Sequence, residues 1–219
     1  MDYDSHYQTL VIVDDHPLVR EGLKAVLARD DGLRVIGEAG GVSEALALVQ
    51  ARKPDLAIID LALADGDGLD LVRRLRAHCS DVKILVCSMR DESLFAERAL
   101  HAGAIGFIHK SEVALHIVDA VRTTLMGRVY LSPAMAERML KRTLPGQESG
   151  GLAVDCLSDR ELQVFGLLGD GQSTAQIAER LHLSVKTIET HRENIKRKLQ
   201  LSNAAELMRC ATIWSHTQC

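Results

Sequence analysis

The stretch Asp55-Leu-Ala-Ile-Ile-Asp60, continued by Leu61-Ala-Leu-Ala-Asp-Gly-Asp-Gly68, decides how this chain is expected to fold. A short apolar run that lies between a proline and glycines is typical of a buried strand. Three further runs also end on polar groups: 10–13 before Asp14 and Asp15, 82–87 before Ser88, and 105–108 before His109 and Lys110. In an open parallel α/β sheet, the carboxyl ends of the strands line one crevice. We therefore expect these polar side chains to meet around Asp60.

Strand-like and helix-like segments alternate along the first part of the chain. A further strand is expected at 33–39, and helices at 17–29, 44–51, 69–78, 93–101 and 112–125, with Ser43 as the cap of the second helix. Five βα units in about 120 residues favour a parallel sheet that is covered on both faces. The fold class expected here is an α/β doubly wound, flavodoxin-like sheet of five parallel strands. Periodicity does not fix the order of the strands, but the order 2-1-3-4-5 sets the strand before Asp14 and Asp15 beside the strand before Asp60, and this is the order that we expect.

Composition and charge limit the function classes. The 219 residues are 47% hydrophobic and 26% charged, and the five cysteines form no CxxC pair, so neither a zinc site nor a disulfide framework is indicated. No apolar run reaches the roughly 20 residues of a membrane span, and residues 1–8 do not resemble a signal peptide, so we expect a cytoplasmic location and no membrane partner. Residues 1–125 hold 14 lysines and arginines against 20 acidic residues, whereas 151–219 hold 8 of each. Any contact with nucleic acid must therefore come from a local basic stripe.

The pattern changes after residue 125. Residues 126–154 are expected to be a linker with a short helix at 134–142, followed by a solvated stretch, Pro145 to Gly151. From Leu157 onward every segment is helical, beginning with a capping box of Ser158 and Glu161. Only residues 182–184 separate the second and third of these helices, and such a tight joint is the signature of a helix-turn-helix. The expected domains are 1–125, the linker 126–154, and an all-α four-helix domain at 155–219.

The converging carboxylates predict a cation site. Oxygen-only ligands suit a hard ion, Mg2+ before Ca2+. A carboxylate in such a site can attack phosphorus and form an acyl phosphate, and the transferred group then needs positive and hydrogen-bonding partners. Lys110 would supply the charge and Ser88 a hydroxyl donor.

With Asp14-Asp15, Asp60, Ser88 and Lys110 in this arrangement, residues 8 to about 125 resemble the receiver domain of two-component systems. The resemblance implies that Asp60 is the phosphoacceptor and that Ser88 and Lys110 bind the phosphoryl group. It implies that Asp15, Asp60 and the Ala62 carbonyl bind Mg2+ directly and Asp14 through water, and that Phe107 and Ser88 form a switch. The loop departs from the family pattern at Leu63 and Ala64, where methionine and proline are frequent.

Simpler interpretations exist for several of these residues. Asp14-Asp15 alone could cap a helix that begins at Pro17. Phe107 could be an ordinary core aromatic. The histidines at 16, 109 and 191 have no partner at metal-ligand spacing and are interpreted as surface or packing residues.

The third helix of the second domain combines an apolar and a polar face. Val185, Ile188, Ile195 and Leu199 fall at helical spacing and are expected to face inward. The outward face carries basic, acidic and hydroxyl side chains, which suits a helix in the DNA major groove. The simpler interpretation of this face is a solvated surface of an ordinary bundle.

This region resembles the LuxR-type helix-turn-helix, through Leu157-Ser-Asp-Arg-Glu161, Ile177-Ala-Glu-Arg-Leu181, Ser184-Val-Lys-Thr-Ile-Glu-Thr-His191 and Ile195-Lys-Arg-Lys-Leu199. With a receiver in front, the whole chain is similar to response regulators of the NarL/FixJ type. By that resemblance the DNA-binding residues are Lys186, Thr187, Glu189, Thr190, Glu193, Lys196 and Arg197, with His191 nearer the DNA backbone. The resemblance also implies a dimer through the last helix, at Ala204, Leu207, Met208 and Ala211.

The leading hypothesis is a DNA-binding transcriptional regulator that is switched by phosphorylation of Asp60. A sensor histidine kinase is the expected donor, double-stranded DNA and a second copy of the chain the expected partners, and RNA polymerase a further one. An aspartyl-phosphate enzyme of the haloacid-dehalogenase kind is disfavoured, because Asp60-Leu-Ala lacks the second aspartate that acts there as general acid. The remaining alternative is a phosphorylation-independent regulator whose receiver serves only for dimerisation or docking.

Overall fold

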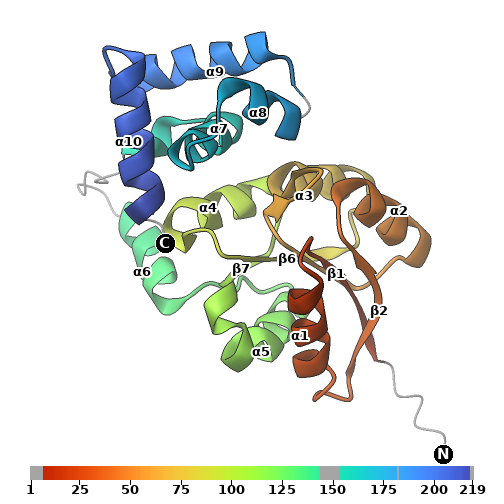
Figure 1. Ribbon diagram of the computed structural model, residues 1–219. Coiled ribbons are helices and arrows are strands. Elements are labelled where there is room, and N and C mark those ends of the chain that lie inside the picture. Colours follow the sequence, from red (N-terminus) through yellow and green to blue (C-terminus); the bar gives the residue numbers. More distant parts are fainter. Residues whose placement is uncertain (1–6, 144–152, 182, 218–219) are drawn as a thin grey trace, which may run out of the picture. The chain divides into compact units, whose positions relative to one another are not determined.

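The computed structural model describes residues 7–143, 153–181 and 183–217 (Figure 1). The chain divides into two compact units, Met1–Leu144 and Pro145–Cys219. The stretch that we expected to be a solvated linker, 145–151, lies outside the described residues, as does residue 182 in the joint of the helix-turn-helix.

The first unit is built on a five-stranded parallel sheet. Its strands are β1 (Gln8–Val13), β2 (Leu33–Ala39), β3 (Leu56–Ile59), β6 (Lys83–Ser88) and β7 (Gly106–His109), in the order β2-β1-β3-β6-β7. All four residues of β3 are buried, because helices cover the sheet on both sides. Both the predicted fold class and the predicted strand order are confirmed.

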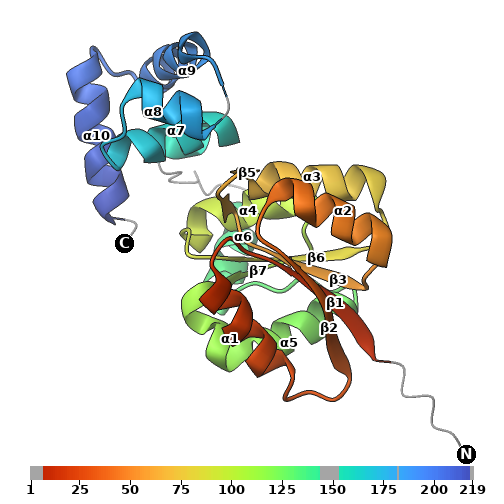
Figure 2. The same cartoon turned by 45° about the vertical axis from the view of Figure 1, so that its right-hand side comes forward.

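Five helices cover the two faces of this sheet (Figures 1 and 2). The helices α1 (Pro17–Leu27) and α5 (Val113–Leu125) lie on one face, and α2 (Val42–Arg52), α3 (Gly68–His78) and α4 (Glu92–Ala102) lie on the other. Leu23 and Leu27 of α1 and Ile117 and Val121 of α5 recur at a spacing of four, so each pair lies on one helix face and packs into the core under the sheet. A short 3-10 helix, η1 (Lys110–Glu112), leads from β7 into α5.

The N-terminus of α2 differs from the expected one. The helix begins at Val42 after Gly41, so Ser43 lies inside the helix and the prediction of Ser43 as its cap is wrong. The carboxylate of Asp65, from the loop after β3, accepts hydrogen bonds from the backbone N–H of Val42 at 2.7 Å and of Ser43 at 3.4 Å. A residue 23 positions away thus satisfies donors that a local cap would otherwise satisfy.

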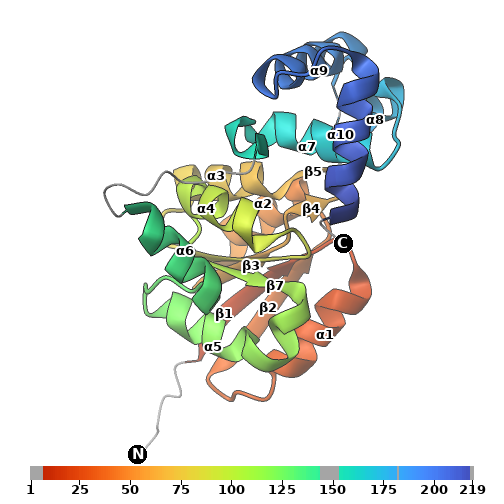
Figure 3. The same ribbon diagram turned by 90° about the vertical axis from the view of Figure 1, so that its left-hand side faces the viewer.

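Residues that follow α5 extend the first unit. Tyr130 forms an isolated parallel bridge with Gly106, and its carbonyl accepts a hydrogen bond from Phe107 N at 2.9 Å. The helix α6 (Pro133–Thr143) then packs on α4 (Figure 3), and its Met135 is buried. The first half of the expected linker is therefore part of the first unit, because it adds a strand-like bridge and an apolar contact to the sheet and its helices.

The second unit is entirely helical in its described residues. It contains the 3-10 helix η2 (Ala153–Cys156) and the helices α7 (Asp159–Gly169), α8 (Thr174–Arg180), α9 (Val185–Lys198) and α10 (Ala204–Thr217). Ser158 with Glu161 forms the predicted capping box, and Ser173 with Gln176 forms a second one. Over the described residues of the whole chain, no helix has both the length and the apolar character that crossing a membrane requires.

Candidate functional site

Four polar side chains meet at the carboxyl ends of the strands. Asp14 follows β1, Asp60 follows β3, Ser88 ends β6, and Lys110 comes directly after β7. Lys110 Nζ lies 2.6 Å from Asp14 Oδ2 and 2.7 Å from Asp60 Oδ2. Ser88 Oγ donates a hydrogen bond to Asp60 Oδ1 at 2.8 Å. The parallel register of four strands thus gathers residues from positions 14 to 110 around one carboxylate.

Lys110 neutralises two buried carboxylates. Its side chain is 9% exposed, and those of Asp14 and Asp60 are each 2% exposed. Burial by itself would lower the pKa of the Lys110 ammonium, but the hydrogen bonds to Asp14 and Asp60 outweigh it and hold that pKa above its ordinary value. The lysine therefore stays protonated at neutral pH.

The cluster also has ligands for a metal ion. One ligand atom each from Asp14, Asp15, His16 and Asp60 can be chosen so that all four lie within 4.8 Å of one another. Asp15 Oδ1 is buried and makes no hydrogen bond, although His16 Nδ1 lies 2.7 Å away. A buried carboxylate oxygen without a donor fits a cation, because such an atom is otherwise costly. His16, which the sequence interpretation placed at the surface or in packing, is 65% exposed and lies beside these carboxylates.

The loop after Asp60 is held close to the acidic cluster. Its two short strands, β4 (Ala62–Leu63) and β5 (Gly66–Asp67), pair antiparallel. A Cβ on Gly68 would lie 2.2 Å from the carbonyl oxygen of Asp60, so only glycine fits where α3 begins. The loop therefore turns back tightly beside Asp60. The assignment of the Ala62 carbonyl as a metal ligand stays a prediction.

Phe107 lies fully inside the core. It is on β7, with 0% of its surface exposed. This position agrees with the simpler interpretation of a core aromatic, and a role for Phe107 as a switch stays a prediction. Cys87 is also buried there, and burial raises the pKa of its thiol to about 12, so it is not a nucleophile.

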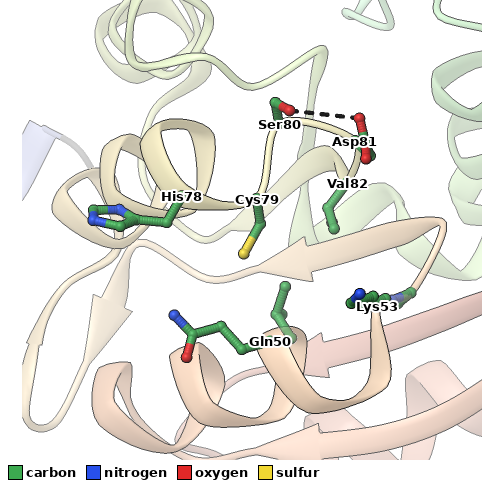
Figure 4. A pocket seen from close by; sticks show the side chains of 9 residues that line it. Gln50, Lys53, His78, Cys79, Ser80, Asp81 and Val82 are labelled. Carbon is green, nitrogen blue, oxygen red and sulfur yellow. Dashed lines mark hydrogen bonds between the residues drawn. The ribbon is translucent and has the colours of Figure 1, made fainter.

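The first unit has a separate cavity at the amino ends of strands β3 and β6. It measures about 360 Å3 and lies where α2 and α3 end and β6 begins (Figure 4). Figure 4 shows the Cys79 side chain, just after α3, facing Gln50 of α2. Since β6 begins beside this cavity and ends at Ser88, the cavity and the acidic cluster lie at opposite ends of the strands.

The helix α9 has the predicted two faces, with one correction. The side chain of Ser184 accepts a hydrogen bond from Thr187 N, as a cap does. Ile188 and Ile195 are fully buried, but Val185 is 46% exposed, so its predicted inward position is wrong. Val185 is in the first turn, at the edge of the apolar face, where the packing against α7 and α8 no longer covers it.

The polar face of α9 is mostly exposed. Five of the predicted DNA-binding residues are exposed and three are half-buried; the exposed ones are Lys186, Glu189, Thr190, Glu193 and Arg197, and the half-buried ones Thr187, His191 and Lys196. Lys196 Nζ forms an ion pair with Glu193 Oε1 at 2.9 Å, so these two charges partly compensate each other. Burial lowers the pKa of His191, whose buried Nδ1 has no hydrogen-bond partner.

Two basic residues of α9, Arg192 and Lys198, serve the fold. Lys198 Nζ lies 2.6 Å from Oε2 of Glu161, the capping-box residue of α7. Burial would raise the pKa of Glu161, but its hydrogen bonds with Lys198 and Ser158 outweigh burial and hold that pKa below its ordinary value. Arg192 Nη1 donates to Thr174 Oγ1 at 2.5 Å, which ties α9 to α8. The sequence suggests neither pairing, because the partners are 37 and 18 positions apart.

The predicted dimerisation face of α10 requires a correction. Leu207 and Ala211 are 0% exposed, because that side of α10 packs on α7. Gly169 of α7 approaches so closely that a Cβ there would lie 2.4 Å from the carbonyl oxygen of Ala211. These two residues belong to the core of the unit and cannot reach a second copy. Ala204 is exposed and Met208 half-buried, so they remain available to a partner.

The chain matches two protein families. The family described as "Response regulator receiver domain" covers residues 10–122, and that described as "Bacterial regulatory proteins, luxR family" covers residues 155–211. The chain is 36% identical to the transcriptional activator protein ExaE of Pseudomonas putida over 202 residues, which cover 92% of this chain and 94% of that protein. It is 34% identical to the response regulator GacA of Pseudomonas viridiflava, over 90% of this chain and 92% of that one. The chain belongs to the two-component response regulators of the NarL/FixJ type.

Solved structures agree with this family. The response regulator ChrA of a heme-sensing two-component system is 29% identical and covers 95% of this chain and 98% of its own, with a TM-score of 0.52. RcsB of Salmonella enterica serovar Typhimurium, bound to promoter rprA in the presence of phosphomimetic BeF3-, is 23% identical, covers 94% and 98% of the two chains, and has a TM-score of 0.70. At that identity the likeness to RcsB shows the fold alone. The two family matches and the relatives show that this response regulator is a DNA-binding transcriptional regulator with an acidic receiver pocket, and not an enzyme.

Proposed function

We propose that Asp60 accepts a phosphoryl group, with Mg2+ bound beside it, and that this event controls how α9 binds DNA. The observation that carries the proposal is the position of Lys110, whose ammonium joins Asp60 and Asp14 while Ser88 donates to the other oxygen of Asp60. An ammonium and a hydroxyl donor beside a single carboxylate are the groups that a bound phosphoryl needs.

In the proposed reaction, a carboxylate oxygen of Asp60 attacks the phosphorus of a phosphohistidine on a sensor kinase. The new P–O bond forms as the P–N bond breaks, and the electron pair stays on the imidazole nitrogen of the kinase. Asp15, Asp60 and the Ala62 carbonyl would hold Mg2+ directly, and Asp14 through water. When bound, the ion neutralises charge on the phosphoryl oxygens. Lys110 then pairs with a phosphoryl oxygen in place of an Asp60 oxygen, and Ser88 donates its hydroxyl to another.

Movement of Ser88 and Lys110 toward the phosphoryl group would bias a two-state receiver, with Phe107 changing its packing. Turning a 1:99 equilibrium into 99:1 requires about 5.5 kcal/mol of differential interaction. A dianionic group held by an ammonium and a divalent ion is a sufficient source of that energy. Phe107 lacks a hydroxyl, so its contribution would be packing alone.

On DNA, the N-terminal half of α9 would read base edges in the major groove, and the basic residues of its outer face would contact phosphates. A dimer would read two half-sites about one DNA turn apart. We propose that the pairing uses the exposed Ala204 and the half-buried Met208 of α10, since Leu207 and Ala211 lie in the core. We further propose that the regulator acts in the cytoplasm, where DNA, the kinase and RNA polymerase are its partners.

The decisive experiment is incubation of the full chain with acetyl phosphate and Mg2+, followed by intact mass measurement. A phosphoryl adduct that is absent in Asp60→Asn supports the proposal. Asp70→Asn is the matched control, since Asp70 is an exposed aspartate of α3 outside the acidic cluster. If the wild type forms no adduct but binds DNA as a dimer, the receiver is a docking module and the phosphorylation-independent alternative holds.

The proposed DNA contacts are tested by a pair of substitutions on α9. Glu189→Ala should relax base preference more than affinity, because a carboxylate can accept from cytosine N4. Lys196→Ala should lower affinity on all sequences, because a phosphate contact carries no base information. Selection of bound DNA from a random pool, followed by affinity measurements on matched and mismatched sites, separates the two effects. Equal effects of both substitutions on both quantities would refute the assigned roles.

A further inference from the structure

His16 lies at the acidic cluster in an orientation that its place in α1 does not require. It is the N-cap residue of α1, yet its side chain makes no capping hydrogen bond. Its backbone N–H donates to Asp14 Oδ1 at 2.9 Å, which holds the turn between β1 and α1. The ring Nδ1 lies 3.2 Å from Asp14 Oδ1 and 2.7 Å from Asp15 Oδ1. An imidazole that is 65% exposed thus directs a nitrogen at the carboxylates.

The ligand atoms of this group lie close enough together for one ion to contact all of them after small side-chain movements. The four potential ligand atoms of Asp14, Asp15, His16 and Asp60 lie within 4.8 Å of one another. Two ligands on opposite sides of one ion are roughly 4.2 Å apart when each metal–ligand distance is about 2.1 Å. A movement of a few tenths of an ångström per side chain would bring the imidazole nitrogen and the carboxylate oxygens to one ion. The buried Oδ1 of Asp15, which makes no hydrogen bond, faces this same space.

We propose that His16 is a further ligand of the ion that Asp15 and Asp60 bind, and that it makes the site favour a borderline first-row ion such as Mn2+, Co2+, Ni2+ or Zn2+ over Mg2+. Oxygen-only sites suit Mg2+, whereas an imidazole nitrogen adds affinity for the borderline ions in the order in which they bind nitrogen. The inference rests on the proposed metal site of the receiver and assigns its ion selectivity to one side chain.

The test is a calorimetric titration of the full chain with Co2+ alone and with Mg2+ alone. His16→Asn should weaken Co2+ binding at least about tenfold and leave Mg2+ binding unchanged, because an amide does not replace an imidazole ligand. His16→Ala should behave in the same way. In the proton NMR spectrum of the Co2+ complex, a strongly shifted imidazole N–H resonance should be present in the wild type and absent in both variants. His116→Ala, at an exposed histidine of α5, is the matched control and should keep both the affinity and the resonance.

The outcomes separate this inference from the proposed function. If Mg2+ binds and supports phosphorylation of Asp60 while His16→Asn leaves Co2+ affinity and the shifted resonance intact, the selectivity role of His16 is refuted and the proposed function stands. If Asp15→Asn leaves the binding of both ions unchanged, the metal site itself is refuted, and both proposals lose it. Far-UV circular dichroism of each variant checks that the sheet is still folded.

Discussion

Replacing Lys110 with Met should destabilise the receiver strongly when no divalent ion is present. The substitution keeps the length and the apolar stem of the side chain and removes the ammonium that lies 2.6 and 2.7 Å from Asp14 and Asp60. Both carboxylates then remain near one another, 2% exposed, without their counter-charge.

The expected magnitude follows from these distances. A single pair of unit charges 2.7 Å apart gains about 6 kcal/mol at an effective dielectric constant of about 20. Desolvation of the three groups offsets much of the gain from the two contacts, and the removal of one partner from a buried pair typically costs about 3 to 5 kcal/mol. In a unit of this size, that loss lowers the midpoint of thermal unfolding by roughly 10 to 17 °C.

Thermal unfolding in EDTA, followed by far-UV circular dichroism, measures this loss. Trp214, the single tryptophan of the chain, packs on Phe165 in the second unit, with ring centroids 5.5 Å apart. Tryptophan fluorescence therefore follows the second unit separately. Lys141→Met is the matched control, because Lys141 forms a 2.6 Å ion pair with Glu137 that is solvent-exposed and should contribute little.

Mg2+ should restore much of the stability lost in Lys110→Met, since the ion then supplies the missing positive charge. At a concentration about 100 times its dissociation constant, a ligand that binds only the folded state adds about 2.7 kcal/mol. If Lys110→Met shifts the unfolding midpoint no more than Lys141→Met does, the lysine does not neutralise the pocket and the electrostatic account fails. A full loss that Mg2+ does not reverse would contradict the metal site.

Three other outcomes are expected. Gly68→Ala should reduce the rate of phosphorylation by acetyl phosphate, measured by intact mass, at least about tenfold, since a Cβ on residue 68 would lie 2.2 Å from the Asp60 carbonyl oxygen. Gly22→Ala is the control and should keep the full rate, because a Cβ on residue 22 would meet nothing within 4 Å. Lys198→Met should destabilise the second unit by about 1 to 2 kcal/mol. The folded pKa of Glu161 is depressed, so the stabilisation by its ion pair is complete above about pH 4.3 and is lost as the pH falls through the folded pKa. The unfolding midpoints of wild type and Lys198→Met, measured by fluorescence, should therefore converge in acid. A difference between the two midpoints that is the same at all pH values would exclude the ion pair. If each subunit contacts about four phosphates, dimer affinity should fall with log salt at a slope near −7, and a flat salt dependence would contradict binding in the groove.

The sequence alone was sufficient for features that depend on neighbours along the chain. Alternating apolar runs and helical periodicity predicted the sheet and its helices, because burial on both faces requires apolar strands between amphipathic helices. The polar residues at the strand ends predicted the meeting of Asp60, Ser88 and Lys110, since parallel strands bring their carboxyl ends to one edge. The capping box of Ser158 and Glu161 was predicted because all of its atoms lie within one turn.

Only the tertiary structure decided which distant segments supply each contact. The cap of α2 comes from Asp65 and not from Ser43, and Lys198 of α9 pairs with Glu161, which lies 37 positions earlier in the chain. Leu207 has the apolar character of a dimer contact yet packs inside its own unit. Periodicity predicts that one face of a helix is apolar or charged, but it does not predict which segment packs against that face. The partner is set by which helices and loops the fold brings within reach, and that requires the positions of segments far apart in the chain.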